Sequence, residues 1–99
     1  MKVSRPHHLS KEAARAKVQD VLPVLMRQYG SSASQVDASW EGDAMRFSFR
    51  AVGHRFQGIL EATESHVVLD MAVPLPLRSF EGAIRARIGQ TLEELFRPG

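Results

Sequence analysis

Arginine and phenylalanine residues alternate in the stretch RFSFRAVGHRFQG, which spans residues 46–58. Aromatic rings and cations interleaved on a strand can stack the bases of a single-stranded nucleic acid and bind its phosphates. The same pattern is typical of a half-buried strand, whose rings face a core while its charges face water. A nucleic-acid site here would use Arg46, Arg50 and Arg55, and the direction of the phenylalanine side chains decides between the two interpretations.

The four histidines do not have the spacing of a metal site. His7 and His8 are adjacent and would point to opposite sides of an extended chain, whereas His54 and His66 fall in separate predicted turns. The sequence has no cysteine, which excludes disulfides, thiolate metal sites and a cysteine nucleophile. We therefore expect histidines at the surface, and we expect no metal and no cofactor.

Catalytic arrangements are also missing from the sequence. It contains no Gly-x-Ser-x-Gly elbow, and its glycines occur singly, without a phosphate-binding loop. Ser10 is explained as the N-cap of a helix, and the carboxylates are spread over predicted turns and one face of a sheet. We therefore predict no catalytic residues and a protein that is not an enzyme.

Hydrophobic spacing predicts the elements that position these side chains. Residues 2–5 fit a short edge strand, and a helix with an apolar stripe should start after Ser10 and end at Gly30. Pro23 should kink this helix or split it in two. Four alternating segments follow, and a last helix carries apolar residues at helical spacing from Phe80 onward. The predicted two-residue turns between these segments lie at 41–44, 52–55 and 63–66.

Pairing the strands through these turns places almost all the large apolar residues on one face. Phe49 then lies opposite Val36 and Gly58, while Arg46 faces Glu61 on the polar side. Two amphipathic helices need this apolar face, so bases could not stack on its phenylalanines. The prediction is one α+β domain over residues 1–99. It has two layers, an antiparallel four- to five-strand meander sheet and two helices on one face, in the order β-α-β-β-β-β-α.

Two apolar features are candidate binding sites. The first is a small patch on the outer sheet face, read either as ordinary surface or as a docking or homodimer contact. Its residues are Ile59, Val68 and Ala72. The second is a pocket between the sheet and the last helix, although a core of this length is normally filled by side chains. Its candidate lining is Trp40, Met45, Met71 and Phe80.

Charge and hydropathy further limit the classes of partner that the sequence allows. The net charge is +2, and acidic and basic segments alternate along the chain, so neighbouring segments neutralise each other. Nucleic acid is therefore a disfavoured partner. No apolar run approaches the length of a membrane span, the first residues lack a signal-peptide core, and the core needs both helix stripes. We expect a cytoplasmic protein without a membrane partner.

Several short motifs together resemble a known family. They are HHLSKEAA (7–14), WEGDAMRFSF (40–49), GHRFQGIL (53–60) and HVVLDMAVPLPL (66–77). The chain is similar to the polyhydroxyalkanoic acid system proteins, small bacterial proteins named for being encoded near polyhydroxyalkanoate synthesis and granule genes. The resemblance implies a cytoplasmic setting with storage-polyester granules, or a granule protein, as a candidate partner. It implies no catalytic residues.

The sequence thus predicts a non-enzymatic accessory protein of the polyhydroxyalkanoate storage system, associated with granules. Two alternatives stay open. One is a carrier of a small apolar ligand held between the sheet and the C-terminal helix. The other is a weak nucleic-acid binder through Arg46, Arg50 and Arg55.

Overall fold

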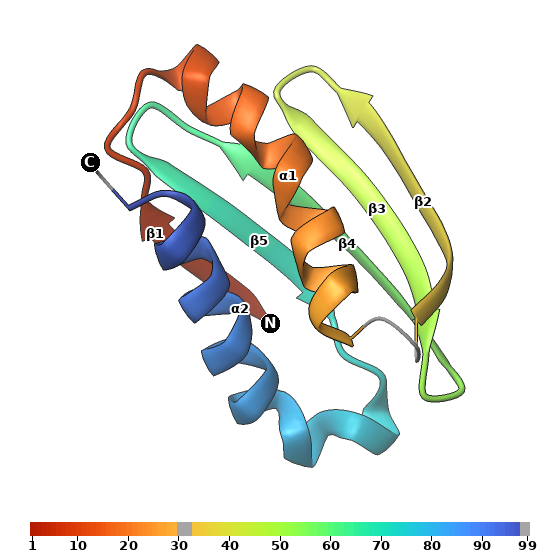
Figure 1. Ribbon diagram of the computed structural model, residues 1–99. Coiled ribbons are helices and arrows are strands. Elements are labelled where there is room, and N and C mark those ends of the chain that lie inside the picture. The colour runs from red at the N-terminus through yellow and green to blue at the C-terminus, as the bar shows by residue number, and fades with distance from the viewer. Residues whose placement is uncertain (30–32, 98–99) are drawn as a thin grey trace.

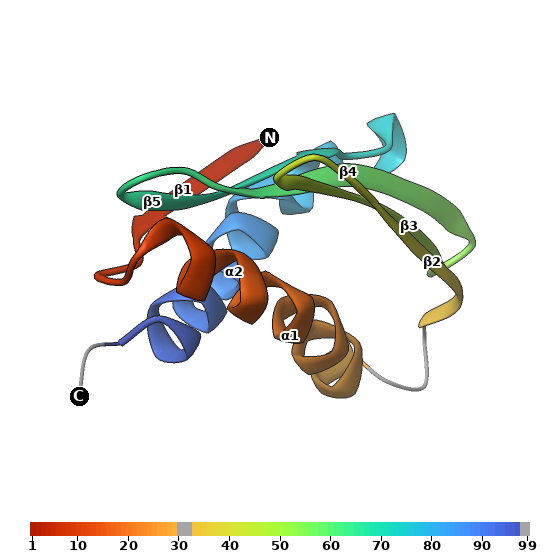
Figure 2. The same cartoon turned by 90° about the horizontal axis from the view of Figure 1, so that it is seen from above.

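The computed structural model describes residues 1–29 and 33–97. Its elements are β1 (Lys2–Pro6), α1 (Lys11–Tyr29), β2 (Ala33–Glu41), β3 (Ala44–Ala51), β4 (His54–Ala62), β5 (His66–Ala72), the 3₁₀ helix η2 (Leu75–Phe80) and α2 (Glu81–Leu95). The strands form one antiparallel sheet in the order β1-β5-β4-β3-β2. Both helices lie on the same face of this sheet (Figures 1 and 2). The predicted two-layer α+β fold is confirmed, and β1 proves to be the edge strand beside β5.

Helix α1 starts as its capping residue predicts. The Ala13 N–H donates a hydrogen bond to Ser10 Oγ at 3.1 Å, which satisfies one of the free donors of the first turn. Pro23 lies on the exposed side of α1, and the helix continues through it as one element. The proline therefore does not split the helix. The predicted end at Gly30 lies outside the described residues.

The turn between β3 and β4 differs from the prediction. Its central residues are Val52 and Gly53, with φ angles of +47° and +78°, and Ala51 pairs with His54. Two successive positive φ angles define a type I′ turn, whereas the sequence suggested Gly53 as the first central residue of a type II′ turn. A β-branched residue in the left-handed region is a genuine outlier.

This turn moves the register of β3 against β4 by two residues. Phe47, rather than Phe49, lies opposite Gly58, and Phe49 pairs with Phe56. The ring of Phe47 fills the space above Gly58, because a Cβ added there would lie only 2.7 Å from Phe47 Cζ. A shift by an even number of residues keeps every side chain on its predicted face. The apolar and polar faces are therefore as predicted although the cross-strand partners are not.

A bulge in β2 causes a second difference. The pairing with β3 shifts between Ser34 and Asp37, and Gln35 has a φ of +51°. Two residues of β2 thus oppose one of β3, which turns Val36 outward and leaves it 46% exposed. The predicted contact between Val36 and the core face is wrong for this reason.

The predicted position of Arg46 opposite Glu61 on the polar face is also wrong. Arg46 lies opposite Ile59 rather than Glu61 because of the changed register. Its guanidinium instead pairs with Glu41, Nε to Oε2, at 2.8 Å.

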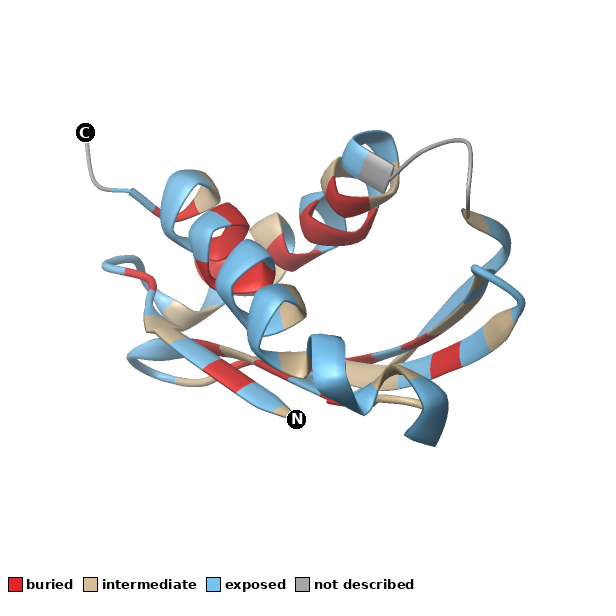
Figure 3. Ribbon diagram, turned by 90° about the horizontal axis from the view of Figure 1, so that it is seen from below, coloured by how far each residue is buried: buried red, intermediate tan, exposed pale blue. Residues whose placement is uncertain are grey.

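The core lies between the sheet and the two helices, and buried residues line the facing sides of both layers (Figure 3). Helix α1 contributes Val18, Val21 and Leu22, which pack over the centre of the sheet. Helix α2 contributes Ile88 and Leu92. The C-terminal end of α2 is joined to the edge strand β1 by the ion pair between Arg5 Nε and Glu93 Oε1, at 2.9 Å.

His7 is buried, with 1% of its surface exposed, so the expectation of surface histidines is wrong at this position. The Leu9 N–H donates to His7 Nδ1 at 3.0 Å, which leaves Nε2 as the protonated nitrogen that donates to the Thr63 carbonyl at 2.8 Å. The backbone N–H of His7 also donates to the Ser65 carbonyl. One imidazole therefore joins the β1–α1 connection to the turn between β4 and β5. This role depends on residues far apart in the chain, so the periodicity of the sequence could not predict it.

Candidate apolar binding groove

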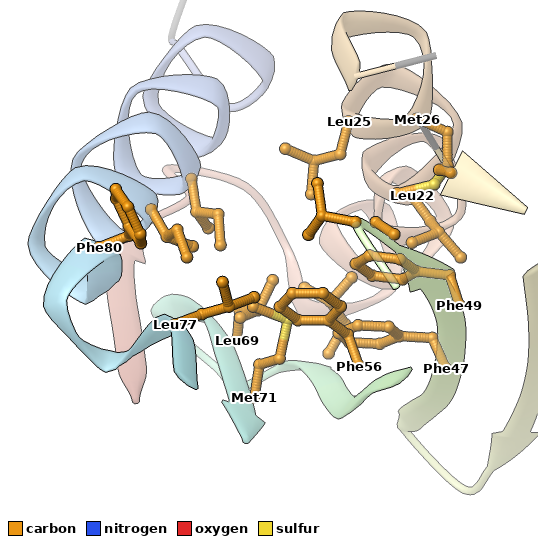
Figure 4. A pocket seen from close by; sticks show the side chains of 16 residues that line it. Leu22, Leu25, Met26, Phe47, Phe49, Phe56, Leu69, Met71, Leu77 and Phe80 are labelled. Carbon is orange, nitrogen blue, oxygen red and sulfur yellow. The ribbon is translucent and has the colours of Figure 1, made fainter. Parts of the chain in front are cut away.

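An open apolar groove of about 370 Å³ lies between α1, α2 and the inner face of the sheet (Figure 4). Its walls come from the second half of α1, the inner faces of β3, β4 and β5, the helix η2 and the start of α2. All sixteen lining residues are apolar. They are Leu22, Leu25, Met26, Ala33, Phe47, Phe49, Ala51, Val52, Phe56, Leu60, Leu69, Met71, Leu77, Phe80, Ile84 and Ile88.

Three phenylalanines form one wall of the groove. The rings of Phe47 and Phe49 have centroids 6.3 Å apart, those of Phe49 and Phe56 lie 5.1 Å apart, and both pairs are inclined by only 10°. Figure 4 shows the three rings facing the side chains of α2 and η2 across the groove. Phe47 and Phe56 are buried, whereas Phe49 is half-buried at the opening. The wall therefore presents a flat hydrocarbon surface that runs from the core to solvent.

Burial changes steadily from the floor of the groove to its rim. Leu60 and Leu69 at the floor are fully buried, while Ile84 on α2 is half-buried. Val52 and Phe80, on opposite sides of the opening, are 65% and 58% exposed. The space is thus continuous with the core but open to solvent, because neither helix covers this end of the sheet.

The chemistry of the lining restricts what the groove can do. Apart from the weakly accepting thioether sulfurs of Met26 and Met71, it offers no side-chain donor, acceptor or ionisable group, so its surface suits hydrocarbon and holds no side chain that exchanges a proton. Within the described residues, no cluster of three or more histidines, cysteines or carboxylates could hold a metal ion. The groove therefore offers mainly apolar contacts, and its volume lies near the lower end of known ligand pockets.

The structure places two of the four predicted pocket residues in the groove. Met71 and Phe80 line the groove, but Trp40 and Met45 do not. Met45 is buried in the core at the start of β3, and the half-buried Trp40 lies under the guanidinium of Arg15, 4.1 Å from the ring centroid. Both lie at the other end of the sheet, and the sequence does not show which end the helices leave uncovered.

The phenylalanines of the groove wall were assigned to a closed core by the sequence pattern. That pattern identifies the inner face of the sheet but does not separate a covered position from an open one. The signal for an opening could have been the proline-rich segment between β5 and α2, since it forms η2 and delays the start of α2 to Glu81.

The outer patch is less continuous than the groove. Ile59, Val68 and Ala72 do lie on the solvent face, but each is opposite a polar residue of the neighbouring strand. Ile59 and Val68 are half-buried and Ala72 is exposed. The patch resembles ordinary sheet surface, where single apolar residues are common.

The three arginines of the nucleic-acid alternative are not gathered into one site. Arg50 and Arg55 lie directly opposite each other on the outer face, whereas Arg46 is further along β3 and pairs with Glu41. The phenylalanines between them point into the groove on the other side of the sheet. Rings and cations therefore do not share a surface on which bases could stack.

Comparison with known proteins gives a family. No curated protein and no solved structure matches the chain. A family model described as "Putative polyhydroxyalkanoic acid system protein" matches residues 1–96. The match extends over all the strands and helices that form the groove. The chain therefore belongs to the polyhydroxyalkanoic acid system protein family, as its short motifs predict.

Proposed function

We propose that this protein is a non-enzymatic accessory protein of the polyhydroxyalkanoate system whose groove binds an apolar chain. The ligand we favour is a segment of the storage polyester at a granule surface. The observation that carries this proposal is the lining of sixteen apolar residues around an open space of about 370 Å³. The family name supports the cellular system, and the groove supports the kind of contact.

Hydrophobic transfer explains why such a groove would be kept open. Each methylene group moved from water into it gains about 0.8 kcal/mol, so four methylenes supply about 3 kcal/mol. A large contiguous apolar surface exposed to water marks an interaction site more often than not. A small domain that leaves Phe80 exposed and Phe49 and Ile84 only half-buried forgoes part of their burial, and a bound apolar chain would restore it.

The same lining favours a neutral chain over a free acid. A carboxylate placed in the groove would lose its hydration and find no donor there, which is strongly unfavourable. An ester group is uncharged and costs far less to desolvate. A polyester segment, whose carboxyl groups are all esterified except at the chain end, suits these walls better than a fatty acid does.

The polar groups of the interior support a binding role without catalysis. Among the described residues, the buried polar side chains are His7 and Thr91. Both have structural partners, since His7 bonds two backbone groups and Thr91 Oγ1 donates to Gln28 Oε1 at 3.3 Å. Neither lines the groove, so no titratable side chain is available to a molecule bound there.

A competition assay with matched variants tests the groove. The protein would be loaded with a fluorescent apolar probe, which is then displaced by a methyl-esterified hydroxyalkanoate oligomer. Ile84→Glu introduces a charge into the lining, and Ala83→Glu introduces the same charge on the exposed side of α2. We expect Ile84→Glu to weaken ester binding at least tenfold and Ala83→Glu to leave it within twofold. Equal affinities for both variants would exclude the groove as the site.

Co-sedimentation with isolated granules tests the partner. The wild-type protein should sediment with granules in preference to polystyrene beads, and the esterified oligomer should compete for this binding. A protein that binds the soluble oligomer but ignores granules would instead be a carrier of small apolar ligands. Binding to neither would contradict the proposed function.

A further inference from the structure

The most exposed large apolar side chains of the described residues lie together at one end of the molecule. Leu75 is 76% exposed, Val52 is 65% exposed and Phe80 is 58% exposed. Val52 occupies the hairpin between β3 and β4, and the other two belong to η2, which is at the same lower end in Figure 1. Val52 and Phe80 also line the same groove, which places them on either side of its opening.

Val52 occupies this place at a conformational cost. Its φ of +47° is disfavoured for a β-branched residue, and the first central position of a type I′ turn is normally asparagine, aspartate or glycine. The valine side chain gains little burial in return, since most of it faces water. Strain of this kind without a folding benefit is typical of functional positions.

Unpaired arginines accompany these apolar residues. Arg50 and Arg55 face each other at the base of the hairpin, and Arg78 belongs to η2. In the part of the chain that the structure describes, none of the three forms an ion pair. Asp37 lines the same outer recess as Arg50 and Arg55, so this recess holds two cations and one anion.

The opposite end of the molecule has a different electrostatic character. There Lys11 Nζ lies 2.9 Å from Asp43 Oδ2, and Arg15 Nε lies 3.5 Å from Oδ1 of the same carboxylate. The hydrogen bond and the charge of Lys11 hold the pKa of the Asp43 carboxyl below its usual value. Lys11 and Arg15 at this end are thus held in ion pairs with a carboxylate of the protein, whereas the structure shows no such pair for Arg50, Arg55 and Arg78 among the residues it describes.

We propose that this end is a docking tip for an anionic phospholipid surface. The docking tip consists of Val52, Leu75 and Phe80 with the flanking Arg50, Arg55 and Arg78. The three apolar side chains would enter the boundary between headgroups and acyl chains, while the arginines bind the phosphates. The combination of apolar points with unpaired cations fits a charged lipid surface better than it fits a neutral polymer or a soluble partner.

This docking does not depend on a membrane-spanning element. No helix of the described residues is long and apolar enough to cross a membrane. The expectation of no membrane partner rests on the absence of a membrane span and of a helix with a free apolar face. The stripe of α1 and the residues Ile88 and Leu92 of α2 do lie in the core. The docking tip uses a hairpin and a 3₁₀ helix instead. It also turns the opening of the groove toward the lipid.

Vesicle co-sedimentation with paired variants tests the docking tip. Phosphatidylglycerol–phosphatidylcholine vesicles would be compared with vesicles of phosphatidylcholine alone, at low and high salt. Leu75→Ser removes an apolar point that does not line the groove, and Leu9→Ser removes an exposed leucine from the other end. We expect Leu75→Ser to reduce binding to the anionic vesicles about tenfold, whereas Leu9→Ser leaves it unchanged.

The arginines are tested in the same assay. Each arginine removed from the docking tip should weaken binding about fivefold, so Arg50→Gln combined with Arg55→Gln should cost about 25-fold. Arg46→Gln, on the same strand and face but already paired with Glu41, is the control and should have little effect. High salt should weaken the wild-type protein more than the double variant.

Several results would overturn this proposal. Equal binding to the neutral vesicles would remove the role of the arginines, and a change of oligomeric state in Leu75→Ser would indicate a contact between two copies of the chain. Preference for oligonucleotides over anionic vesicles would indicate a nucleic-acid surface. By contrast, a Leu75→Ser variant that loses vesicle binding but still binds the ester would support the docking tip. It would also separate this docking from the proposed function, because Leu75 is not part of the groove.

Discussion

Filling the groove with a side chain of the protein itself should stabilise the fold and block ligand binding. Ala51 is the best position because it lines the groove, is half-buried and follows the inward-facing residues of β3. In Ala51→Phe a new ring would project into the space beside the parallel rings of Phe49 and Phe56. Stability and binding would then change in opposite directions, which general unfolding cannot produce.

The structure supports magnitudes for both effects. A fully buried phenylalanine gains about 1.5–3 kcal/mol, and a half-buried one at the groove about 1 kcal/mol. The preference of strands for aromatic residues over alanine adds a few tenths. The free energy of unfolding should therefore rise by about 1 kcal/mol. If the ring displaces four methylene groups of the ligand, the affinity should fall by about 3 kcal/mol, or about two orders of magnitude.

Urea denaturation would give the stability, with Trp40 as the fluorescent reporter, since it is the only tryptophan and lies outside the groove. Displacement of the apolar probe by the esterified oligomer would give the affinity. Ala44→Phe places the same ring on the outer face at the other end of β3 and should leave the affinity unchanged. A variant Ala51→Phe that binds the ester normally would refute the groove as the ligand site.

Further predictions concern the backbone and the interior. Val52→Asn should raise the free energy of unfolding by about 1 kcal/mol in urea, because asparagine tolerates a positive φ, and should weaken vesicle binding. Gly58→Ala should lower the free energy of unfolding by about 2–3 kcal/mol, because the new Cβ meets a backbone carbonyl and a ring. Gly82→Ala should raise it by about 0.5–1 kcal/mol, because no atom lies within 4 Å of the new Cβ. His7→Leu should cost about 3 kcal/mol by leaving two backbone groups unpaired, while His8→Asn, which keeps the positive φ of an exposed residue, should change stability by less than 0.5 kcal/mol. Thermal unfolding that ranks Gly58→Ala above Gly82→Ala, or His7→Leu level with His8→Asn, would contradict this reasoning.

The sequence predicts the layers of this fold because the governing signals are local. Alternation with a period of two assigns each strand residue to a face, and the apolar stripe of α1 requires a sheet to cover. The assignment of residues to faces and the packing of α1 on the sheet are both correct, although the predicted register is not. The turn at Val52 could not be predicted, because valine rarely adopts this conformation. It places the turn one residue earlier in the chain, which shifts the cross-strand pairing by two residues. The bulge that turns out Val36 has no signal in the alternation either.

The candidate site was predicted less well, for a different physical reason. Whether a residue on the apolar face is covered depends on where the helices end, and hence on long-range packing. Phe49 and Met45 have the same periodicity, yet one lines the groove and the other lies in the closed core. The burial of His7 has the same origin, since its two hydrogen-bonding partners lie on different segments of the chain.

The positions of the groove and the docking tip have a consequence for an insoluble ligand. A polyester or acyl chain that crosses water to reach a protein exposes its full apolar surface on the way, at about 0.8 kcal/mol for each methylene group. Because Val52 and Phe80 belong to both the groove rim and the docking tip, a docked protein would hold the opening against the source of the chain. Transfer would then bypass water. The strain at Val52 would be retained for this reason, since the polar residue that relieves it would also place a hydrated side chain between the lipid and the groove.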